Sequence, residues 1–369
     1  MSFVGIGVSY FNNAGISTIT QVFKDSPAAK AGIEVGDILL AVDGKDIRDM
    51  EAEEIRKLVL GKEGSSVQLL IRREAEEKNI SVIRGKVDTT VFAEKKGNAV
   101  YLHIYSFGEN TYNEVIRYLD DYKNESRLII DLRDNGGGYQ TAVENIAGLF
   151  LPQGTVMMRQ IYTDQHEEKF ETRSHVYYDN FTYIDILINE NTASASEVLT
   201  MALREQHPHT TLVGTTSYGK GVVQTTYPLR DGSALKLTTS KWLSPQGVWI
   251  NKVGIKPDIE IKLDEALTHL YGKFPVGEVF HEDQVSPFIQ SAALALRFMD
   301  YQLDRTDGYF STALRSALSA YQRDKGLAVT GELNQESYES LVSGVYRVWN
   351  FDKQKDLQLQ AALKDMATK

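Results

Sequence analysis

The sequence predicts a multidomain α/β protein whose C-terminal part is a helical module. Three observations lead to this fold class. The chain has 369 residues, which is more than one hydrophobic core usually organises. Its middle part alternates strand-like and helix-like segments with glycine turns between them, a pattern typical of α/β layer structures. From Phe288 onward the pattern of apolar residues is helical.

The composition is that of a globular protein, with 42% hydrophobic and 24% charged residues. The formal net charge of −10 argues against a polyanion as partner, so we expect no nucleic-acid binding. Because the chain has no cysteine, disulfides and thiolate chemistry are excluded. No run of 18 apolar residues exists that would predict a membrane span. The seven histidines show no paired ligand spacing, so we expect neither a metal nor another cofactor.

Residues 1–86 form the first predicted unit. Its expected strands and helices are Ile16–Phe23, Asp37–Val42, Ser66–Arg72, Ala28–Gly32 and Glu51–Leu60. The unit resembles a PDZ domain in the stretch Ser26–Gly44 and in the loop Gly5, Ile6, Gly7 and Val8. The resemblance implies that this loop binds a terminal carboxylate through free N–H groups, and that the adjacent strand edge accepts an extended peptide. A small α/β domain without a ligand is the alternative.

Residues 87–272 form the second predicted unit. Asn98–Phe107 alternates as a strand, and Glu114–Tyr122 reads as a helix. Arg127–Leu132 predicts a buried strand that runs into the glycine turn Arg133–Gly138, after which Ala142–Phe150 is helical. This order of strand, glycine turn and helix favours an α/β core.

Ser194 is a candidate nucleophile at a strand-to-helix corner. Phe181–Ile188 has the composition of a buried strand, and the apolar residues from Ala195 onward repeat at helical spacing. A serine between them lies beside unsatisfied backbone N–H groups, which stabilise negative charge. The structural alternative is that Ser194 only caps the helix, because Ser194 and Glu197 fit the S-x-x-E capping box.

Lys220 is a candidate base in a glycine-rich turn. Gly214–Gly221 nearly spells the phosphate-binding loop G-x-x-x-x-G-K-[ST], but Gly221 replaces the hydroxyl that would bind magnesium. The residues after it have strand composition, whereas such a loop opens a helix, so nucleotide binding is the weaker hypothesis. A lysine serves as a base only after losing its proton, which burial favours. The alternative is an ordinary solvated lysine in a turn.

The two segments together resemble the signature of the C-terminal processing peptidases, also called tail-specific proteases. The matching strings are T-A-S-A-S-E and G-x-x-x-x-G-K-G-x-V-Q. The resemblance implies a ClpP/crotonase-like α/β core in which Ser194 is the nucleophile, Lys220 is the general base and Gln224 helps to hold the lysine. The string D-L-R-D-N-G-G-G resembles the D-L-R-x-N-x-G-G element of the family, which implies that Gly137 and Ala195 form the oxyanion hole.

The C-terminal part begins after an acidic, turn-rich stretch, Pro275–Pro287, that we interpret as a linker. Residues 284–346 form the third predicted unit, in which Asp307–Leu341 is similar to a small three-helix peptidoglycan-binding module. Such a module would bind the cell wall or make contacts between domains or subunits, and the sequence favours neither. Residues 347–369 are expected to form a charged helical tail.

These resemblances imply a serine endopeptidase with a Ser–Lys dyad that processes the C-termini of proteins. The PDZ domain would capture its substrates and gate the site, in envelope proteolytic signalling. We expect an extracytoplasmic protein, secreted or attached to the envelope, whose export signal is absent from this chain. The expected partners are proteins or peptides with exposed C-termini, a second copy in a homodimer, and peptidoglycan. The rival hypothesis is a non-catalytic PDZ and wall-binding scaffold protein.

Overall fold

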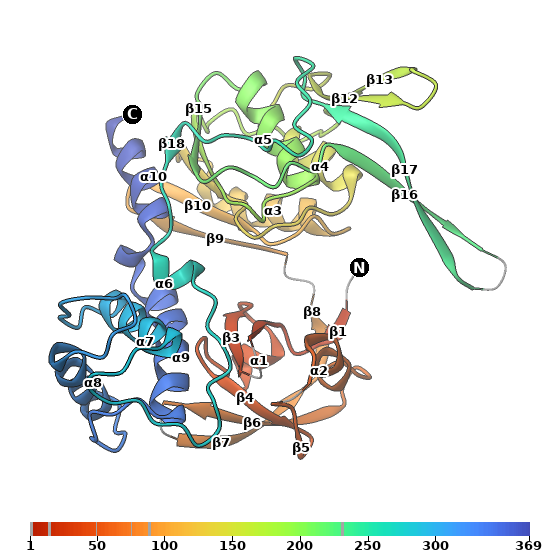
Figure 1. Ribbon diagram of the computed structural model, residues 1–369. Helices are drawn as coiled ribbons and strands as arrows, with labels where there is room; N and C mark the ends of the chain where they lie inside the picture. Colours follow the sequence, from red (N-terminus) through yellow and green to blue (C-terminus); the bar gives the residue numbers. More distant parts are fainter. Residues whose placement is uncertain (1–2, 14–15, 49, 75, 88–89, 230–231) are drawn as a thin grey trace. The chain divides into compact units, whose positions relative to one another are not determined.

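The computed structural model describes residues 3–13, 16–48, 50–74, 76–87, 90–229 and 232–369 (Figure 1). The chain forms two compact units, and each joins segments that are distant in sequence. Residues 89–262 and 357–369 form what we call the core unit, and residues 2–88 and 263–356 form the composite unit. Among the described residues, no helix combines the length and the apolar character needed to cross a membrane.

A six-stranded sheet lies at the centre of the core unit, in the order β18-β15-β14-β11-β10-β9. Its neighbouring strands are parallel except for the antiparallel edge strand β9. The strands are β9 (Val91–Lys96), β10 (Ala99–Ile104), β11 (Arg127–Asp131), β14 (Tyr183–Ile188), β15 (Thr210–Gly214) and β18 (Ile259–Glu260). The central strands β11 and β14 are mostly apolar and buried, as expected where both faces of a parallel sheet are covered, although Asp185 lies inside β14.

Helices cover both faces of this sheet. They are α3 (Thr111–Leu119), which η1 (Asp120–Tyr122) extends, α4 (Gln140–Ala147), α5 (Ala195–Gln206) and α10 (Leu357–Thr368). The first three share the main hydrophobic core with strand residues such as Ile130 and Ile186. Ile129 and Leu187 point to the opposite face because side chains alternate along a strand, and there they pack with Met366 of α10.

The core unit also contains an antiparallel sheet, which we call the cap sheet, in the order β13-β12-β17-β16. Its strands are β12 (Val156–Tyr162), β13 (Glu167–Glu171), β16 (Val222–Pro228) and β17 (Ala234–Leu243). Strand β12 packs against α5. The long β16–β17 hairpin extends away from the helices of the core unit (Figure 1), and most of its side chains are exposed. The sequence analysis left residues 151–180 unassigned and therefore missed the β12–β13 hairpin.

The first part of the composite unit is a small β structure with the sheet order β2-β3-β4-β6-β7. Strand β5 pairs with β4, and β1 forms a separate pair with β8. The elements are β1 (Phe3–Gly5), β2 (Val8–Asn13), β3 (Ile16–Val22), α1 (Pro27–Lys30), β4 (Ile38–Val42), β5 (Lys45–Asp46), α2 (Ala52–Val59), β6 (Ser66–Arg73), β7 (Glu76–Ile83) and β8 (Gly85–Val87). Ile55 and Val59 of α2 pack into the core of this sheet.

The second part of the composite unit is helical. It contains α6 (Glu265–Thr268), α7 (Pro287–Phe298), α8 (Thr312–Asp324), α9 (Gln335–Phe351) and η2 (Lys353–Lys355). Helix α9 also packs on the β part: the Ser343 hydroxyl donates to the Gly36 carbonyl, and Arg347 pairs with Glu34 at 3.3 Å. A Cβ at Gly36 would collide with the Arg347 side chain, so the glycine allows α9 to pack this close to the β part. Ile38 of β4 shares one hydrophobic core with the helices.

Most of the predicted elements are present, with ends shifted by up to three residues. The expected strand at Phe181–Ile188 is β14, and the residues after Gly221 form strand β16, as their composition predicted. The stretch that we interpreted as a linker is packed into the helical part, because Phe280 bridges Leu333 and residue 285 bridges residue 309. The expected boundary after residue 346 lies inside α9.

Candidate active site

A pocket of about 340 Å³ lies between α4, α5 and the cap sheet. Four of the predicted site residues line it, namely Ser194, Ala195, Lys220 and Gln224. The other lining residues are mostly apolar or glycine, apart from a glutamine and a second lysine: Gly138, Tyr139, Gln140, Val143, Met158, Val198, Val222, Val223, Lys236 and Trp242. The fold therefore brings the serine and the lysine, which are 26 positions apart in the sequence, to one cavity.

Ser194 occupies the sharp turn between β14 and α5. Its φ of 59° is in the left-handed region, which a residue other than glycine adopts only when its surroundings impose it. Strained strand-to-helix turns of this kind present nucleophilic serines, because they expose the hydroxyl. Ala195 is the first residue of α5, so its N–H has no acceptor within the helix and can donate to an anion in the pocket.

The fully buried Glu197 connects the two candidate catalytic segments. Its Oε2 accepts hydrogen bonds from the backbone N–H of Ser194 at 2.9 Å and of Lys220 at 2.8 Å. Its Oε1 accepts from the Ser217 hydroxyl and the Gly219 N–H, both at 2.6 Å. The sequence analysis interpreted this residue only as part of a capping box. The hydrogen bond from Ser194 agrees with the capping box. The other three donors belong to residues 217–220, which we call the lysine loop, so the carboxylate links this loop to α5.

The loop that carries Lys220 is held by two tryptophans that the sequence analysis did not single out. The indole N–H of Trp242 donates to the Lys220 carbonyl, and that of Trp249 donates to the Gly221 carbonyl, both at 2.8 Å. Gly219 has a φ of 81°, and a Cβ there would lie 2.7 Å from a neighbouring backbone nitrogen. The half-buried Lys220 side chain makes no hydrogen bond or ion pair with any residue that the structure describes. Its amine is therefore free to meet a reacting group.

Gly137, predicted for the oxyanion hole, lies directly against the serine turn. It has a φ of 101°, and a Cβ there would lie 2.9 Å from both the Ala195 nitrogen and the Ser194 Cβ. Its own N–H donates to Asn135 Oδ1 at 2.9 Å. The next residue, Gly138, lines the pocket. The glycine turn thus lies beside the pocket. The N–H of Gly137, the predicted oxyanion donor, is already hydrogen-bonded to Asn135 within the same turn.

A buried ion pair supports the strand end from which this glycine turn begins. Arg133 binds Asp131 at 2.6 Å, and the Tyr101 hydroxyl donates to the same carboxylate at 2.7 Å. Burial opposes ionisation of Asp131, but the charges of Arg133 and His103 outweigh it and hold the pKa of the carboxyl well below its usual value. Arg133 also donates to Gln358 Oε1 at 3.2 Å, so α10 contributes to this support.

Gln224 lies on β16, directly after a bulge at Val223, and lines the pocket. Its exposed side chain makes no hydrogen bond to Lys220 among the contacts of the described residues. The backbone of Lys220 is held instead by Glu197 and Trp242. The role of Gln224 in holding the lysine amine therefore stays a prediction.

The predicted carboxylate-binding loop lies in the composite unit, between β1 and β2. Its residues are Gly5, Ile6, Gly7 and Val8. The carbonyls of Ile6 and Gly7 accept hydrogen bonds from the N–H groups of Ala28 and Phe23, at 2.8 and 3.0 Å. Gly7 has a φ of 78°, and a Cβ there would lie 2.4 Å from that of Ser26. The next strand, β2, is at the edge of its sheet, where an extended peptide could pair with it.

Family models match three parts of the chain. The model for peptidase family S41 matches residues 98–261, which include Ser194, Lys220 and the glycine turn. A PDZ domain model matches residues 18–73, and a peptidoglycan binding domain model matches residues 286–341. The order of the three matches agrees with the order of the resemblances in the sequence.

Similar proteins extend over most of the chain. The carboxy-terminal processing protease CtpB of Bacillus subtilis is 33% identical, covering 99% of this chain and 77% of the relative. A "Probable CtpA-like serine protease" of Staphylococcus epidermidis is 32% identical over 91% of this chain and 68% of the relative. A solved structure of an S41 protease from Bacteroides fragilis has a TM-score of 0.55 at 18% identity, covering 74% of this chain and 79% of that one. The chain therefore belongs to peptidase family S41 and is a serine protease with a PDZ domain.

Proposed function

We propose that this protease uses Ser194 as its nucleophile and Lys220 as its general base. The observation that supports the assignment best is their shared position. Both residues line one pocket, and their backbone N–H groups bind the same oxygen of Glu197. A serine on a strained turn and an amine that forms no ion pair with the described part of the chain are the components that a serine–lysine pair requires.

In the proposed reaction the neutral amine of Lys220 accepts the proton of the Ser194 hydroxyl as the oxygen attacks the scissile carbonyl. The oxyanion binds the N–H groups of Ala195 and Gly137, each worth about 3 kcal/mol of barrier. Because the N–H of Gly137 is bonded to Asn135, the oxyanion must compete with that amide oxygen. The lysine ammonium then protonates the leaving amine. Water hydrolyses the acyl-enzyme in a second step, with the same lysine as base.

We propose C-termini of proteins as the substrates. The PDZ match and the similarity to a carboxy-terminal processing protease of Bacillus subtilis support this assignment. The loop at Gly5–Val8 would bind the terminal carboxylate, and the edge strand β2 would pair with the extended tail. We also propose that tail capture gates the peptidase, in an envelope-located homodimer that acts in proteolytic signalling. Its helical part would bind peptidoglycan or contact another subunit.

The catalytic assignment is tested by digesting a loosely folded protein and identifying the products by mass spectrometry. We expect Ser194→Ala and Lys220→Ala each to lower the rate at least about 1,000-fold. Lys256→Ala is the matched control, because this exposed lysine lies outside the pocket, and its rate should stay within twofold. Undiminished cleavage by Ser194→Ala would reject the assignment, and a wild-type protein that cleaves nothing would favour the scaffold hypothesis.

The gating proposal is tested with a pair of competitor peptides that differ only at the C-terminus. One ends in a free carboxylate and the other in an amide, and the rate of a short fluorogenic substrate is followed in the presence of each. We expect only the carboxylate form to change that rate, because the loop N–H groups recognise the negative charge. Equal effects of the two peptides would reject gating through the PDZ loop.

A further inference from the structure

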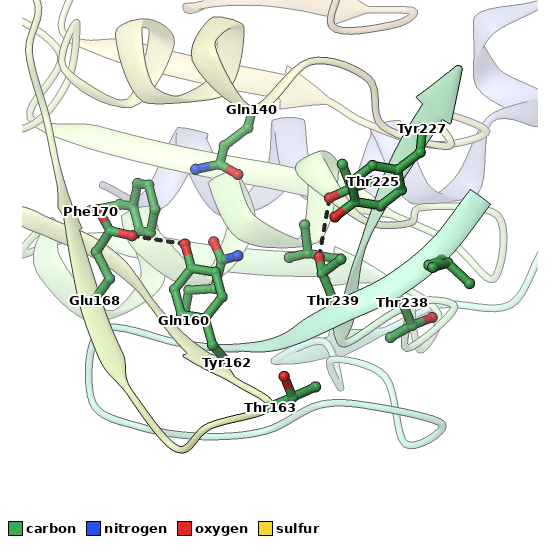
Figure 2. A pocket seen from close by; sticks show the side chains of 12 residues that line it. Gln140, Gln160, Tyr162, Thr163, Glu168, Phe170, Thr225, Tyr227, Thr238 and Thr239 are labelled. Atoms are coloured by element: carbon green, nitrogen blue, oxygen red, sulfur yellow. Dashed lines mark hydrogen bonds between the residues drawn. The ribbon is translucent and has the colours of Figure 1, made fainter. Parts of the chain in front are cut away.

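A second pocket, of about 700 Å³, lies on the cap sheet and adjoins the active site. Gln140 and Val223 line both cavities. Figure 2 shows Gln140 entering the second pocket from the side opposite Gln160 and Tyr162. Among the residues that line it, only Gln160 is buried, so this side chain forms the floor.

The floor of the pocket offers a hydrogen-bond acceptor without a donor. Gln160 is 5% exposed, and its Nε2 donates to the Ser240 hydroxyl at 2.6 Å. Its Oε1 has no hydrogen-bond partner among the described residues. Because this oxygen is itself buried, a ligand N–H group gains a bond to it only if the Gln160 amide turns toward the cavity.

The charge and the aromatic walls of the pocket indicate which kind of ligand group would bind there. Glu168 is the cross-strand partner of Gln160, so the two side chains share one face of the cap sheet. It is the one charged residue among those that line the pocket. Tyr162 donates to the Glu168 carboxylate at 2.8 Å, and Phe170 lines the same wall (Figure 2). Aromatic walls accept an alkyl stem, and a carboxylate together with an amide oxygen accepts a cationic head.

One strand connects this pocket to the reacting residues. Met158, Gln160 and Tyr162 alternate along β12 and therefore face the same side. Met158 lines the active-site pocket, and the other two line the second pocket. Since two residues of a strand span about 6.7 Å, the distance from Met158 to Tyr162 is about 13 Å. Gln160 lies half as far from Met158 as Tyr162 does, so an extended substrate that passes Ser194 reaches the second pocket in two to four residues.

We propose that the second pocket is a subsite for a lysine or arginine side chain of the polypeptide substrate, two to four residues from the scissile bond. Its alkyl stem lies against Tyr162 and Phe170, its head binds the exposed carboxylate of Glu168, and Gln160 Oε1 joins this contact when its amide turns toward the cavity. This inference rests on the proposed peptidase activity of the neighbouring pocket. It adds a side-chain preference near the cut to the recognition of C-termini.

The test uses a set of peptides with one sequence, in which a single lysine is moved through the four positions on each side of the cleaved bond. At the best position, lysine is then replaced by methionine, glutamine or glutamate. We expect the wild-type protein to cleave the lysine peptide with a kcat/KM about tenfold above that of the methionine peptide. The glutamine peptide should be intermediate, and the glutamate peptide should be the poorest.

Two exposed glutamates on β13 give matched variants. Glu168→Gln should bring the lysine-to-methionine ratio close to one, and Glu168→Lys should favour the glutamate peptide. Glu167→Gln is the control: Glu167 pairs across the strands with Ile161, on the face opposite Gln160, and binds Arg159 at 3.3 Å. It should keep the wild-type ratio. A wild-type ratio within twofold of one, or an equal loss in both glutamine variants, would overturn the proposal.

A binding measurement separates this proposal from the catalytic one. Fluorescence anisotropy with the Ser194→Ala protein compares the lysine and methionine peptides without cleavage, and the Ser194→Ala/Glu168→Gln protein repeats the comparison. Tighter binding of the lysine peptide that depends on Glu168 supports the subsite even if no peptide is cut. Equal binding of both peptides overturns the subsite, whatever the activity of the wild-type protein.

Discussion

Glu197 is fully buried, and each of its oxygens accepts two hydrogen bonds from N–H or hydroxyl groups. In a Glu197→Gln variant one acceptor becomes an NH₂ group that faces donors. A buried group left unsatisfied costs about 1–3 kcal/mol, and here the mismatch also separates the turn of Ser194 from the loop of Lys220. Small displacements of reacting groups can cost 100-fold, so we expect kcat/KM to fall by at least about that factor.

Peptide hydrolysis and thermal unfolding measure the two consequences of this change. The midpoint temperature should fall together with the activity, because the same four bonds hold the fold and the site. Glu205→Gln is the control, since Glu205 lies at the end of the same helix and accepts one bond, from the Gln246 N–H at 2.7 Å. Its activity should stay within twofold. Full activity in Glu197→Gln would show that Glu197 serves only as a capping residue of α5.

Gly137 is a second position where one atom decides the geometry. An added Cβ would lie 2.9 Å from backbone atoms of Ala193 and Ala195, and the φ of 101° disfavours any side chain. The glycine turn must then move away from Ser194, which removes an oxyanion donor. We expect Gly137→Ala to lower kcat about 100-fold or more while KM changes little, as measured with a fluorogenic peptide.

A glycine in an open turn provides the comparison for that variant. Gly154 also has a positive φ, of 80°, but an added Cβ there meets no atom within 4 Å. Gly154→Ala should lower the stability of the protein, because alanine disfavours a positive φ, but it should leave kcat within twofold of the wild type. If both variants lost activity equally, backbone strain in general would explain the effect, and contact with the serine turn would not.

Ser194 and Lys220 could be singled out from the sequence because their side chains stand in short motifs with a chemical meaning. Glu197 stands in the same motif, but its role depends on donors that lie 20 to 23 positions further along the chain. A capping box already accounts for a glutamate at this spacing, so the sequence offers no reason to look further. The hydrogen bond that occupies the Gly137 N–H is likewise a property of the folded turn.

Elements with a strong apolar pattern were predictable, whereas the β12–β13 hairpin was not. Strand β13 reads Glu-Glu-Lys-Phe-Glu and is almost entirely exposed. Charged residues disfavour strands in isolation, so this segment owes its conformation to pairing with β12 and not to propensity. The floor residue Gln160 lies on β12, whose composition Val-Met-Met-Arg-Gln-Ile-Tyr does indicate a strand, but its pairing with β13 could not be predicted.

The lysine loop shows how one element holds another in position. Trp249 is 47% exposed, so its ring adds little to the core, while its indole N–H binds the Gly221 carbonyl. In Trp249→Phe the ring remains and this hydrogen bond is lost, which costs about 1 kcal/mol. We expect kcat to fall about tenfold, with the free energy of unfolding lowered by no more than about 1 kcal/mol, as measured by urea unfolding.

The third tryptophan, Trp349, provides the control for this change because it lies on α9 in the composite unit. Trp349→Phe should leave kcat within twofold of the wild type. If Trp249→Phe lost stability and activity in proportion, the indole would act on folding, and its proposed effect on the lysine loop would be contradicted.

In the whole molecule, contacts between distant segments define the units. The sequence predicts consecutive units, whereas the structure joins residues 2–88 with 263–356 and returns 357–369 to the core unit. The contacts responsible include Arg72 with Glu339 and Arg133 with Gln358. A pattern of apolar residues shows that a helix has a buried face but does not name the partner of that face. The tail was therefore predictable as a helix, and its place beside β14 and β15 was not.

The end of α10 brings a charge to a fully buried carboxyl group, Asp185 of β14, which binds the Lys369 amine at 2.7 Å. Burial raises the pKa of Asp185 to about 7, and the lysine opposes that shift only in part. In the unfolded chain the carboxyl titrates near pH 4, so the folded protein binds the proton more tightly. The resulting stability is fully present below about pH 4 and is lost as the pH rises to about 7.

Asp185→Asn removes this titration and keeps the size of the side chain. The free energy of unfolding of the wild type minus that of the variant should therefore fall between pH 5 and pH 8, by up to about 3 kcal/mol. Urea unfolding at four pH values measures it, with Asp121→Asn at an exposed position as the control that should show no such trend. Parallel curves for the wild type and Asp185→Asn would mean that Asp185 stays ionised throughout this range. The attachment of α10 to the core unit would then not depend on pH through this pair.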